Sequence, residues 1–192
     1  MRQGFGLLAG KPVVEITLAV ITSDSSIGIS DVMTLSEFEK LKLHNQAGEI
    51  IVTGKHVQKA YLDGNSHNTK IKVDDQIWHR TGDAGYLDDN GQLWLLGRCS
   101  AKILKKERAI YPFSIEAAAM TFEKVKRAAV IEIEQKIILV IECLQNSAAK
   151  TCQQLKQQLN DIDEVRVVEK IPMDKRHHSK VLYDELRKIA LR

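Results

Sequence analysis

The residues best suited to chemistry lie between Trp78 and Arg98, in the stretch WHRTGDAGYLDDNGQLWLLGR. Thr81-Gly82-Asp83 places a carboxylate beside a glycine that can adopt positive φ. Asn90-Gly91, flanked by apolar residues, predicts a hairpin with a type I′ turn, which needs positive φ at both central residues. The hairpin would hold Asp83 near its start and Arg98 at its end, so that an acid and a base on one rigid ribbon could grip a polar ligand. Spacing leaves open the alternative of an ordinary surface hairpin with an exposed ion pair.

A second group of reactive side chains lies near the C-terminus, in the stretch DKRHHSK that ends at Lys180. The pair His177-His178 could belong to a metal site or to a polar loop without function. Adjacent histidines without further ligands are poor evidence for a metal, and we predict none. The basic residues could also contact nucleic acid, but they lack interleaved aromatic residues and a recognisable nucleic-acid-binding fold, so we expect no such partner.

The elements that must position the first group are short strands. A β-branched run over Val13–Ile21 and a glycine-bounded run over Gly48–Gly54 predict strands ahead of the hairpin. Thr34 to Glu37 fits a capping box for a short helix, with a loop as the alternative. Several short strands with turns between them predict a small or distorted β-barrel.

The second half of the chain has a different pattern. The order of predicted elements is a β-hairpin, a helix, two strands, a helix, a strand and a final helix, which is a small α+β domain. After the hairpin these elements cover Ser114–Phe122, Ala128–Glu134, Lys136–Cys143, the helix that follows Ser147, Val165–Val168 and Val181–Leu191.

Composition limits the class of protein. The 192 residues are 44% hydrophobic with a net charge of +3, enough for one medium domain or two small ones. No run approaches the roughly 20 apolar residues of a membrane span, and the N-terminus lacks the apolar core of a signal peptide. The three cysteines form no Cys-x-x-Cys pair, so we expect reduced thiols in a cytoplasmic protein.

Taken together, these motifs resemble the adenylate-forming (AMP-binding) superfamily, which contains acyl-CoA synthetases, luciferases and non-ribosomal adenylation domains. The matching residues follow in the family's order: Gly10 to Val14, Gly48 to Gly54, Trp78 to Asp83, Gly97-Arg98 and Pro112 to Glu116. The resemblance implies an α+β protein with a distorted β-barrel subdomain over residues 1–98, the end of a large N-terminal domain. A small mobile α+β lid domain would follow over residues 99–192.

The stretch from Arg98 to Glu116 matches the family without a gap but departs from it at functional positions. Ser100 falls on the hinge position, where Asp or Lys is usual. Lys105 and Glu107 fall in the loop that serves the second half-reaction in the family, and Glu107 replaces a glycine that lets coenzyme A pass close to the backbone. Leu104 stands where a lysine is common. Adenylation is therefore better supported than thioester formation.

The resemblance also implies residue roles. Lys180 would be the catalytic lysine that bridges the attacking carboxylate and the α-phosphate, while Thr81, Asp83 and Arg98 would bind the nucleotide. Residues Asp174 to Lys180 resemble a subgroup that includes the β-lactone synthetases of olefin biosynthesis and fatty-acid CoA ligases.

The resemblance implies an ATP-dependent, AMP-forming carboxylate ligase of the fatty-acid acyl-CoA synthetase type, which uses ATP and Mg²⁺ and has coenzyme A as a candidate acceptor. The family's phosphate loop, magnesium ligands and acyl pocket are not in this sequence. The chain thus looks like a C-terminal fragment that lacks the rest of the large N-terminal domain and is inactive alone. The alternatives are a β-lactone synthetase acting on a β-hydroxy fatty acid and a non-catalytic binding module derived from such a ligase.

Overall fold

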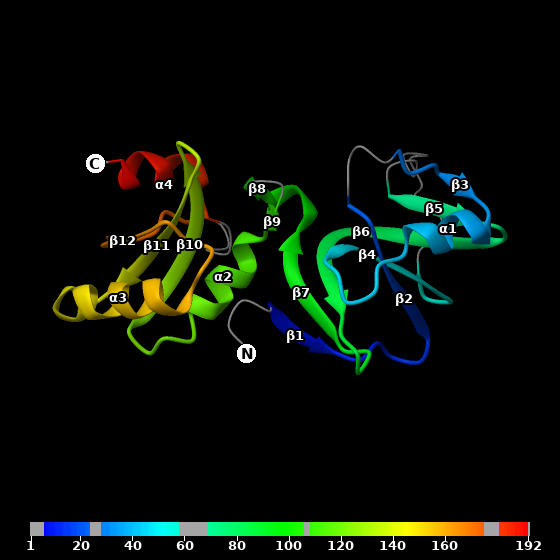
Figure 1. Cartoon of the computed structure of the whole chain (residues 1–192), viewed down its shortest axis with the longest axis horizontal. Helices are drawn as coiled ribbons and strands as arrows, with labels where there is room; N and C mark the ends of the chain where they lie inside the picture. Colours follow the sequence, from blue (N-terminus) through cyan, green and yellow to red (C-terminus); the bar gives the residue numbers. More distant parts are fainter. Residues whose placement is uncertain (1–5, 24–27, 58–68, 106–107, 175–180, 192) are drawn as a thin grey trace. The chain divides into compact units, whose positions relative to one another are not determined.

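The computed structural model describes residues 6–23, 28–57, 69–105, 108–174 and 181–191 (Figure 1). The chain forms two compact units, Leu8–Ser100 and a second unit built mainly from Ala101–Arg192. Each has its own hydrophobic core. Within the described residues no helix is long and apolar enough to cross a membrane.

The first unit is a curled sheet with one short helix. Strands β1, β7, β6, β4 and β2 are neighbours in that order, and β5 joins β6 on the same edge as β7 and also pairs with β3. The bounds are β1 Leu7–Gly10, β2 Ile16–Ile21, β3 Val32–Met33, α1 Leu35–Leu41, β4 Gly48–Gly54, β5 Lys70–Val73, β6 Gln76–Leu87 and β7 Leu93–Arg98. The long β6 bends as it passes from β5 to β7, which gives the half-barrel form expected from the sequence.

The helix α1 carries the predicted capping box. The Thr34 hydroxyl accepts from the Glu37 N–H, and the Glu37 carboxylate accepts from the Thr34 N–H at 2.7 Å, so two groups at the helix start are satisfied together. The helix buries Phe38 against Trp78, with ring centroids 5.0 Å apart. This contact fixes the first half of β6 in the core of the unit.

The hairpin that carries Asp83 and Arg98 is present, but its turn differs from the predicted type. Only Gly91 has positive φ, at 69°, whereas Asn90 does not, so the type I′ prediction is wrong. The Asp88 carboxylate explains the difference because it accepts from the N–H groups of Asn90 and Gln92 and from Trp94 Nε1, each at 2.9 Å. These bonds favour a loop longer than the two-residue type I′ turn, in which the Asp88 side chain takes up backbone N–H groups of the loop.

The second unit has the predicted α+β order. A two-stranded hairpin is followed by a three-stranded sheet in which β10 and β11 are antiparallel and β11 and β12 are parallel. The bounds are β8 Ile103–Lys105, β9 Arg108–Ile110, α2 Pro112–Ala119, β10 Val125–Ile133, β11 Lys136–Cys143, α3 Ala148–Gln158, β12 Glu164–Val168 and α4 Tyr183–Ala190, with short 3-10 turns at Cys99–Ala101 and Gln145–Ser147.

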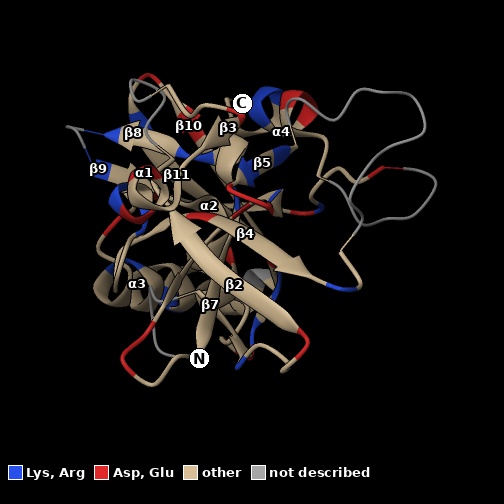
Figure 2. Ribbon diagram, turned by 90° about the vertical axis from the view of Figure 1, so that its right-hand side faces the viewer, with Lys and Arg blue, Asp and Glu red and all other residues tan. Residues whose placement is uncertain are grey.

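Side chains alternate between the two faces of this sheet. One face, including Val130 and Leu139, packs against α2 and α3, and the other, including Ile131 and Val140, packs against α4 (Figure 1). In α4 the acidic Asp184 and Glu185 lie in the first turn and basic residues in the last, as suits the helix dipole (Figure 2).

Close backbone approach in the first unit predicts a sharp glycine requirement. Gly48→Ala would place a Cβ 2.1 Å from the Ile21 carbonyl oxygen, whereas a Cβ at Gly28 would meet nothing within 4 Å. We expect Gly48→Ala to lower the free energy of unfolding by about 1–3 kcal/mol or more in urea titration. The control Gly28→Ala should stay within about 0.5 kcal/mol of the parent, and equal effects of the two variants would contradict this packing.

The Asp88 turn predicts a pH-dependent contribution to stability. The hydrogen bond from Trp94 and then those from the backbone hold the pKa of Asp88 below its ordinary value of 3.8. The carboxylate therefore stabilises the fold fully above pH 3.8, and this contribution is lost as the pH falls through the lowered pKa. We expect Asp88→Asn to be less stable at pH 7, with a gap from the parent that closes in acid.

Urea titrations of both proteins between pH 7 and pH 2.5 would measure that gap. Asp75→Asn, at an exposed position between β5 and β6, is the control. A gap that stays constant across the range would show that the Asp88 charge does not contribute.

Candidate functional site

The Thr-Gly-Asp motif forms a bulge in β6. On the β4 side, Arg80 pairs with Ile51 and Ala84 pairs with Glu49, so Thr81, Gly82 and Asp83 stand opposite the single residue Ile50. On the other edge of β6, β5 pairs as far as His79 and β7 begins to pair at Asp83. Thr81 and Gly82 therefore lie where β6 has no ladder partner on either edge, and Asp83 begins the pairing with β7; bulges of this kind are common beside binding sites.

The threonine hydroxyl closes the bulge. Thr81 Oγ1 donates to the Ile50 carbonyl at 2.7 Å and accepts from the Asp83 N–H at 3.0 Å. Gly82 has φ of 70°, a conformation that side chains rarely adopt. These features explain why the local sequence is Thr-Gly-Asp: the hydroxyl replaces a ladder bond, and the glycine permits the reversal that presents Asp83.

A buried ion pair supports the bulge from β4. Glu49, whose side chain is only 6% exposed, accepts from Arg80 Nη2 at 2.6 Å and from Arg80 Nε at 3.0 Å. Its Oε1 also accepts from the Gly82 N–H at 3.3 Å. A carboxylate with several such partners can be buried at modest cost, and here it connects two strands directly beneath the motif.

Asp83 and Arg98 are direct cross-strand partners. Arg98 Nε lies 3.1 Å from Asp83 Oδ1, and Arg98 Nη1 donates to the Thr81 carbonyl at 3.2 Å. Their side chains remain 35% and 67% exposed. Exposed pairs of this kind are worth only about 0–1 kcal/mol, so a polar ligand could replace part of the pair at little cost. The structure brings together all three of the nucleotide-binding residues expected from the sequence.

The remaining candidate residues have different settings. Ser100 lies in the 3-10 turn Cys99–Ala101, where one compact unit ends and the other begins. Lys105 ends β8, and its ammonium pairs with Asp163 at 2.5 Å. Glu107 and the proposed catalytic Lys180 lie outside the described residues, so their roles stay predictions.

Asp163 anchors the base of the β8–β9 hairpin to the sheet. Its carboxylate accepts from Lys105 and from the Ile137 N–H at 2.7 Å, and the Lys105 hydrogen bond is the main reason that the pKa of Asp163 lies below its usual value. On the return strand, Arg108 lies 2.8 Å from Asp161. Lys105 thus has a structural partner, whatever it does in a second half-reaction.

Sequence reasoning assigned no role to Glu49 and Arg80. The available signal was an acidic residue inside a strand that is otherwise glycine and β-branched, because a charge at such a position needs a partner. Its partner could not be read from the sequence because Arg80 lies on another strand.

Metal ligands are not gathered in this part of the molecule. Among the described residues no group of three or more His, Cys, Asp or Glu side chains could hold a metal ion. The side chains in the described part of the chain thus do not fit a magnesium site.

Comparisons with known proteins support a family assignment, although no protein-family model matches the chain. It is 28% identical over 144 residues to 4-coumarate-CoA ligase 1 of Narcissus pseudonarcissus, covering 70% of this chain and 26% of the relative. It is also 28% identical over 210 residues to 4-coumarate–CoA ligase 1 of Oryza sativa subsp. japonica, covering 98% of this chain and 37% of the relative.

Solved structures give the same fold. Apo MatB from Rhodopseudomonas palustris matches with a TM-score of 0.71 and 21% identity, over 95% of this chain and 35% of that one. O-succinylbenzoate coenzyme A synthetase (MenE) from Bacillus subtilis, in complex with AMP, matches with a TM-score of 0.69 and 24% identity, over 94% and 35%. The chain thus spans only about a third of these proteins. In sequence the chain is thus similar to part of the 4-coumarate–CoA ligases, and in fold it is similar to the C-terminal portion of adenylate-forming, acyl-CoA synthetase-like enzymes.

Proposed function

We propose that this chain is part of an ATP-dependent ligase that activates a carboxylic acid as its acyl-adenylate. It would supply nucleotide-binding residues and the C-terminal lid domain of that ligase. The observation that carries the proposal is the Thr81–Asp83 bulge, with Arg98 directly across from its carboxylate. In a chain of this superfamily, that arrangement supports binding of the ribose of ATP. The AMP-bound MenE structure, which shares the fold, is consistent with this reading.

Asp83 and Arg98 have the chemistry for the ribose. An ionised carboxylate has about four acceptor sites, so Asp83 can accept from two vicinal hydroxyls after giving up part of its contact with Arg98. Arg98 can donate to the ribose from a position fixed by the Thr81 carbonyl. Thr81 and Glu49 would act only indirectly, by holding the bulge in place.

Lys180 supplies the catalytic cation in this proposal. The substrate carboxylate attacks the α-phosphorus of ATP in line, a new C–O–P link forms, and pyrophosphate leaves with the electron pair of the broken P–O bond. Two anions approach, and negative charge grows on the phosphoryl oxygens, so a positioned ammonium is the main requirement. Magnesium would neutralise phosphate charge from ligands outside this chain.

The identity of the substrate acid and the identity of the group that accepts the acyl chain are two further proposals. The pattern from Asp174 to Lys180 supports a fatty acid, whereas the curated relatives are 4-coumarate ligases, which makes an aryl acid the competing substrate. Coenzyme A is the proposed acceptor. Glu107 at the usual glycine position specifically favours the alternative, a β-lactone synthetase in which the substrate's own hydroxyl replaces the thiol. The three free cysteines are consistent with our placement in the cytoplasm.

The ribose proposal is tested by binding. In the complete ligase, Asp83→Asn should weaken an acyl-AMP analogue about 10- to 100-fold, because hydrogen bonds to a charged group contribute about 1.5–3 kcal/mol. Calorimetry would measure the dissociation constant, and Asp75→Asn, which removes an exposed carboxylate from the same unit, should leave it unchanged. Unaltered affinity in Asp83→Asn would exclude Asp83 as a ribose ligand. If even the parent does not bind, the non-catalytic module is the better description.

The lysine proposal is tested by chemistry. Lys180→Ala in the complete ligase should slow ATP–pyrophosphate exchange about 10²- to 10³-fold, the usual cost of losing one electrostatic group, while ATP binding changes little. The 192-residue chain alone should show no exchange. Normal exchange in Lys180→Ala would show that Lys180 is not the catalytic cation. Robust exchange by the isolated chain would contradict the proposal that adenylation needs residues outside these 192.

A further inference from the structure

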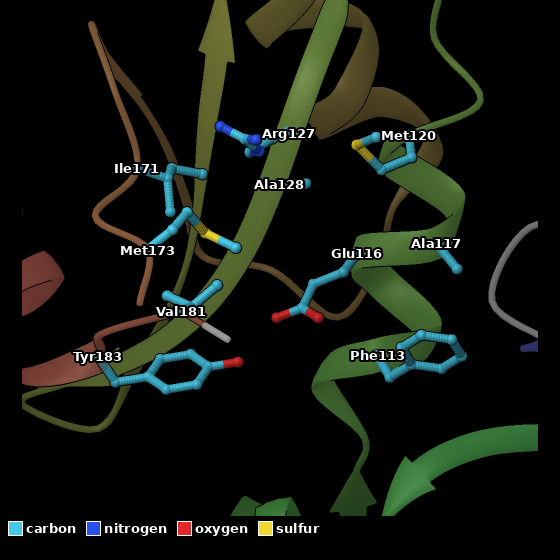
Figure 3. A pocket seen from close by; sticks show the side chains of 10 residues that line it. All are labelled: Phe113, Glu116, Ala117, Met120, Arg127, Ala128, Ile171, Met173, Val181 and Tyr183. Carbon is cyan, nitrogen blue, oxygen red and sulfur yellow. The ribbon is translucent and has the colours of Figure 1, made fainter. Parts of the chain in front are cut away.

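The second unit has a pocket beside its hydrophobic core. The pocket lies between α2, the first residues of β10 and the segments that carry Ile171 and Tyr183, and its volume is about 600 Å³ (Figure 3). All of its lining residues belong to this one unit. Pockets of this size that combine an apolar wall with a few polar groups are typical binding sites for small molecules. The apolar wall includes Phe113, Met120, Ile171, Met173 and Val181.

One polar group of the lining is the carboxyl of Glu116 in α2, which Figure 3 shows directed into the pocket. Its Oε1 accepts from the Val130 N–H of β10 at 2.8 Å, so the carboxyl is held on the sheet. Burial is the main reason that the pKa of Glu116 lies above its ordinary value of 4.5. A carboxyl has about four acceptor sites when ionised and can also donate when protonated. Glu116 can therefore hydrogen-bond a ligand hydroxyl in either state.

The lining also contains a base, Arg127 of β10. Among the described residues its ion-pair partner is Glu142, and the 3.6 Å between Arg127 Nη1 and Glu142 Oε1 is longer than a hydrogen bond. Glu142 accepts instead from the Ile171 N–H at 2.6 Å. The Arg127 side chain is 41% exposed, so its donors are accessible to a ligand. The planar fork of a guanidinium matches the two oxygens of a carboxylate.

The acid, the base and the apolar wall together select one class of ligand. We propose that this pocket binds a small amphiphilic hydroxy acid. The carboxylate of the ligand pairs with Arg127, its hydroxyl bonds to Glu116, and its apolar body lies on the wall between them. Arg127 disfavours an organic ammonium, and Glu116 disfavours a second carboxylate at its own end of the pocket, because like charges repel. The inference does not depend on the roles proposed for Asp83 and Lys180, so it can fail while the proposed function stands.

The binding test is a titration of the ¹⁵N-labelled chain, followed by NMR, with probes that differ by one group. The probes are ω-hydroxyoctanoate, octanoate, which lacks the hydroxyl, and octanol, which lacks the carboxylate. We expect ω-hydroxyoctanoate to shift the amides of Ala117, Ala128 and Met173 in a saturable way, while the amide of Ile51 in the core of the first unit stays unmoved. It should bind about 10-fold more tightly than either other probe, because each of them lacks one hydrogen bond to a charged group.

Two substitutions assign the two ends of the ligand. Arg127→Gln should weaken ω-hydroxyoctanoate and octanoate about 10-fold and leave octanol unchanged. Glu116→Gln should weaken ω-hydroxyoctanoate about 5-fold but should not weaken octanoate, which brings no hydroxyl to that side chain. Lys126→Gln and Glu132→Gln remove the same charges from exposed positions of β10, and both of these matched controls should bind all probes as the parent does.

The inference is overturned if ω-hydroxyoctanoate moves none of the lining amides or if its shifts spread over both units. Equal binding of all three probes would also overturn it, because that result would mean unspecific apolar contact. Ala117→Phe gives an independent test should a polar variant fail to fold, since it fills the pocket from α2 and removes no polar group. It should abolish binding of ω-hydroxyoctanoate, and undiminished binding would show that the ligand does not occupy this pocket.

Discussion

The candidate site depends on the buried carboxylate of Glu49, which contacts the bulge in β6. Glu49 accepts from both Arg80 and Gly82, and it does so from inside the core of the first unit. In a regular strand successive side chains point to opposite faces of the sheet. The two extra residues between Arg80 and Ala84 interrupt this alternation, and Asp83 lies within the interruption. The bulge shifts the register of β6 against β4, and Asp83 lies opposite Arg98 in the pairing of β6 with β7. The residues proposed to bind the nucleotide are therefore carried by strands of a sheet that has a hydrophobic core of its own.

The two units use the same physical device for different ends. In each, a largely buried carboxylate accepts hydrogen bonds from another element: Glu49 of β4 accepts from Arg80 and from the Gly82 N–H of β6, and Glu116 of α2 accepts from the Val130 N–H of β10. Buried polar groups cost free energy unless they are satisfied. Once satisfied, they fix relative positions more sharply than apolar packing, which tolerates repacking.

Much of the fold could be predicted from the sequence because its signals are local. The capping box at Thr34, the hairpin through Gly91 and the order of elements after Arg98 all follow from neighbouring residues. The turn type was wrong because the Asp88 side chain bonds the loop closed, which outweighs the Asn-Gly preference. The short β5 was not predicted, since Lys70-Ile71-Lys72-Val73 is defined by its pairing with β6 and β3.

The sequence predicted the residues proposed to contact the nucleotide, but not the residues that hold them in place. Asp83 and Arg98 could be placed by the hairpin, and they and Thr81 were named from the family resemblance, but Glu49 and Arg80 act through partners far away in the sequence. Such pairings are decided by tertiary structure and carry no spacing signal. These pairings nevertheless help to hold the motif in place, because Glu49 accepts from the Gly82 N–H next to Asp83.

The most direct test of the central claim is a titration of the ¹⁵N-labelled chain with AMP, followed by NMR. If the bulge grips ribose, the amides of Gly82 and Asp83 and the backbone of Arg98 should shift together in a saturable way, and Asp83→Asn should abolish the shifts. A titration that leaves these three residues unmoved, or that moves only residues elsewhere in the chain, would contradict the account.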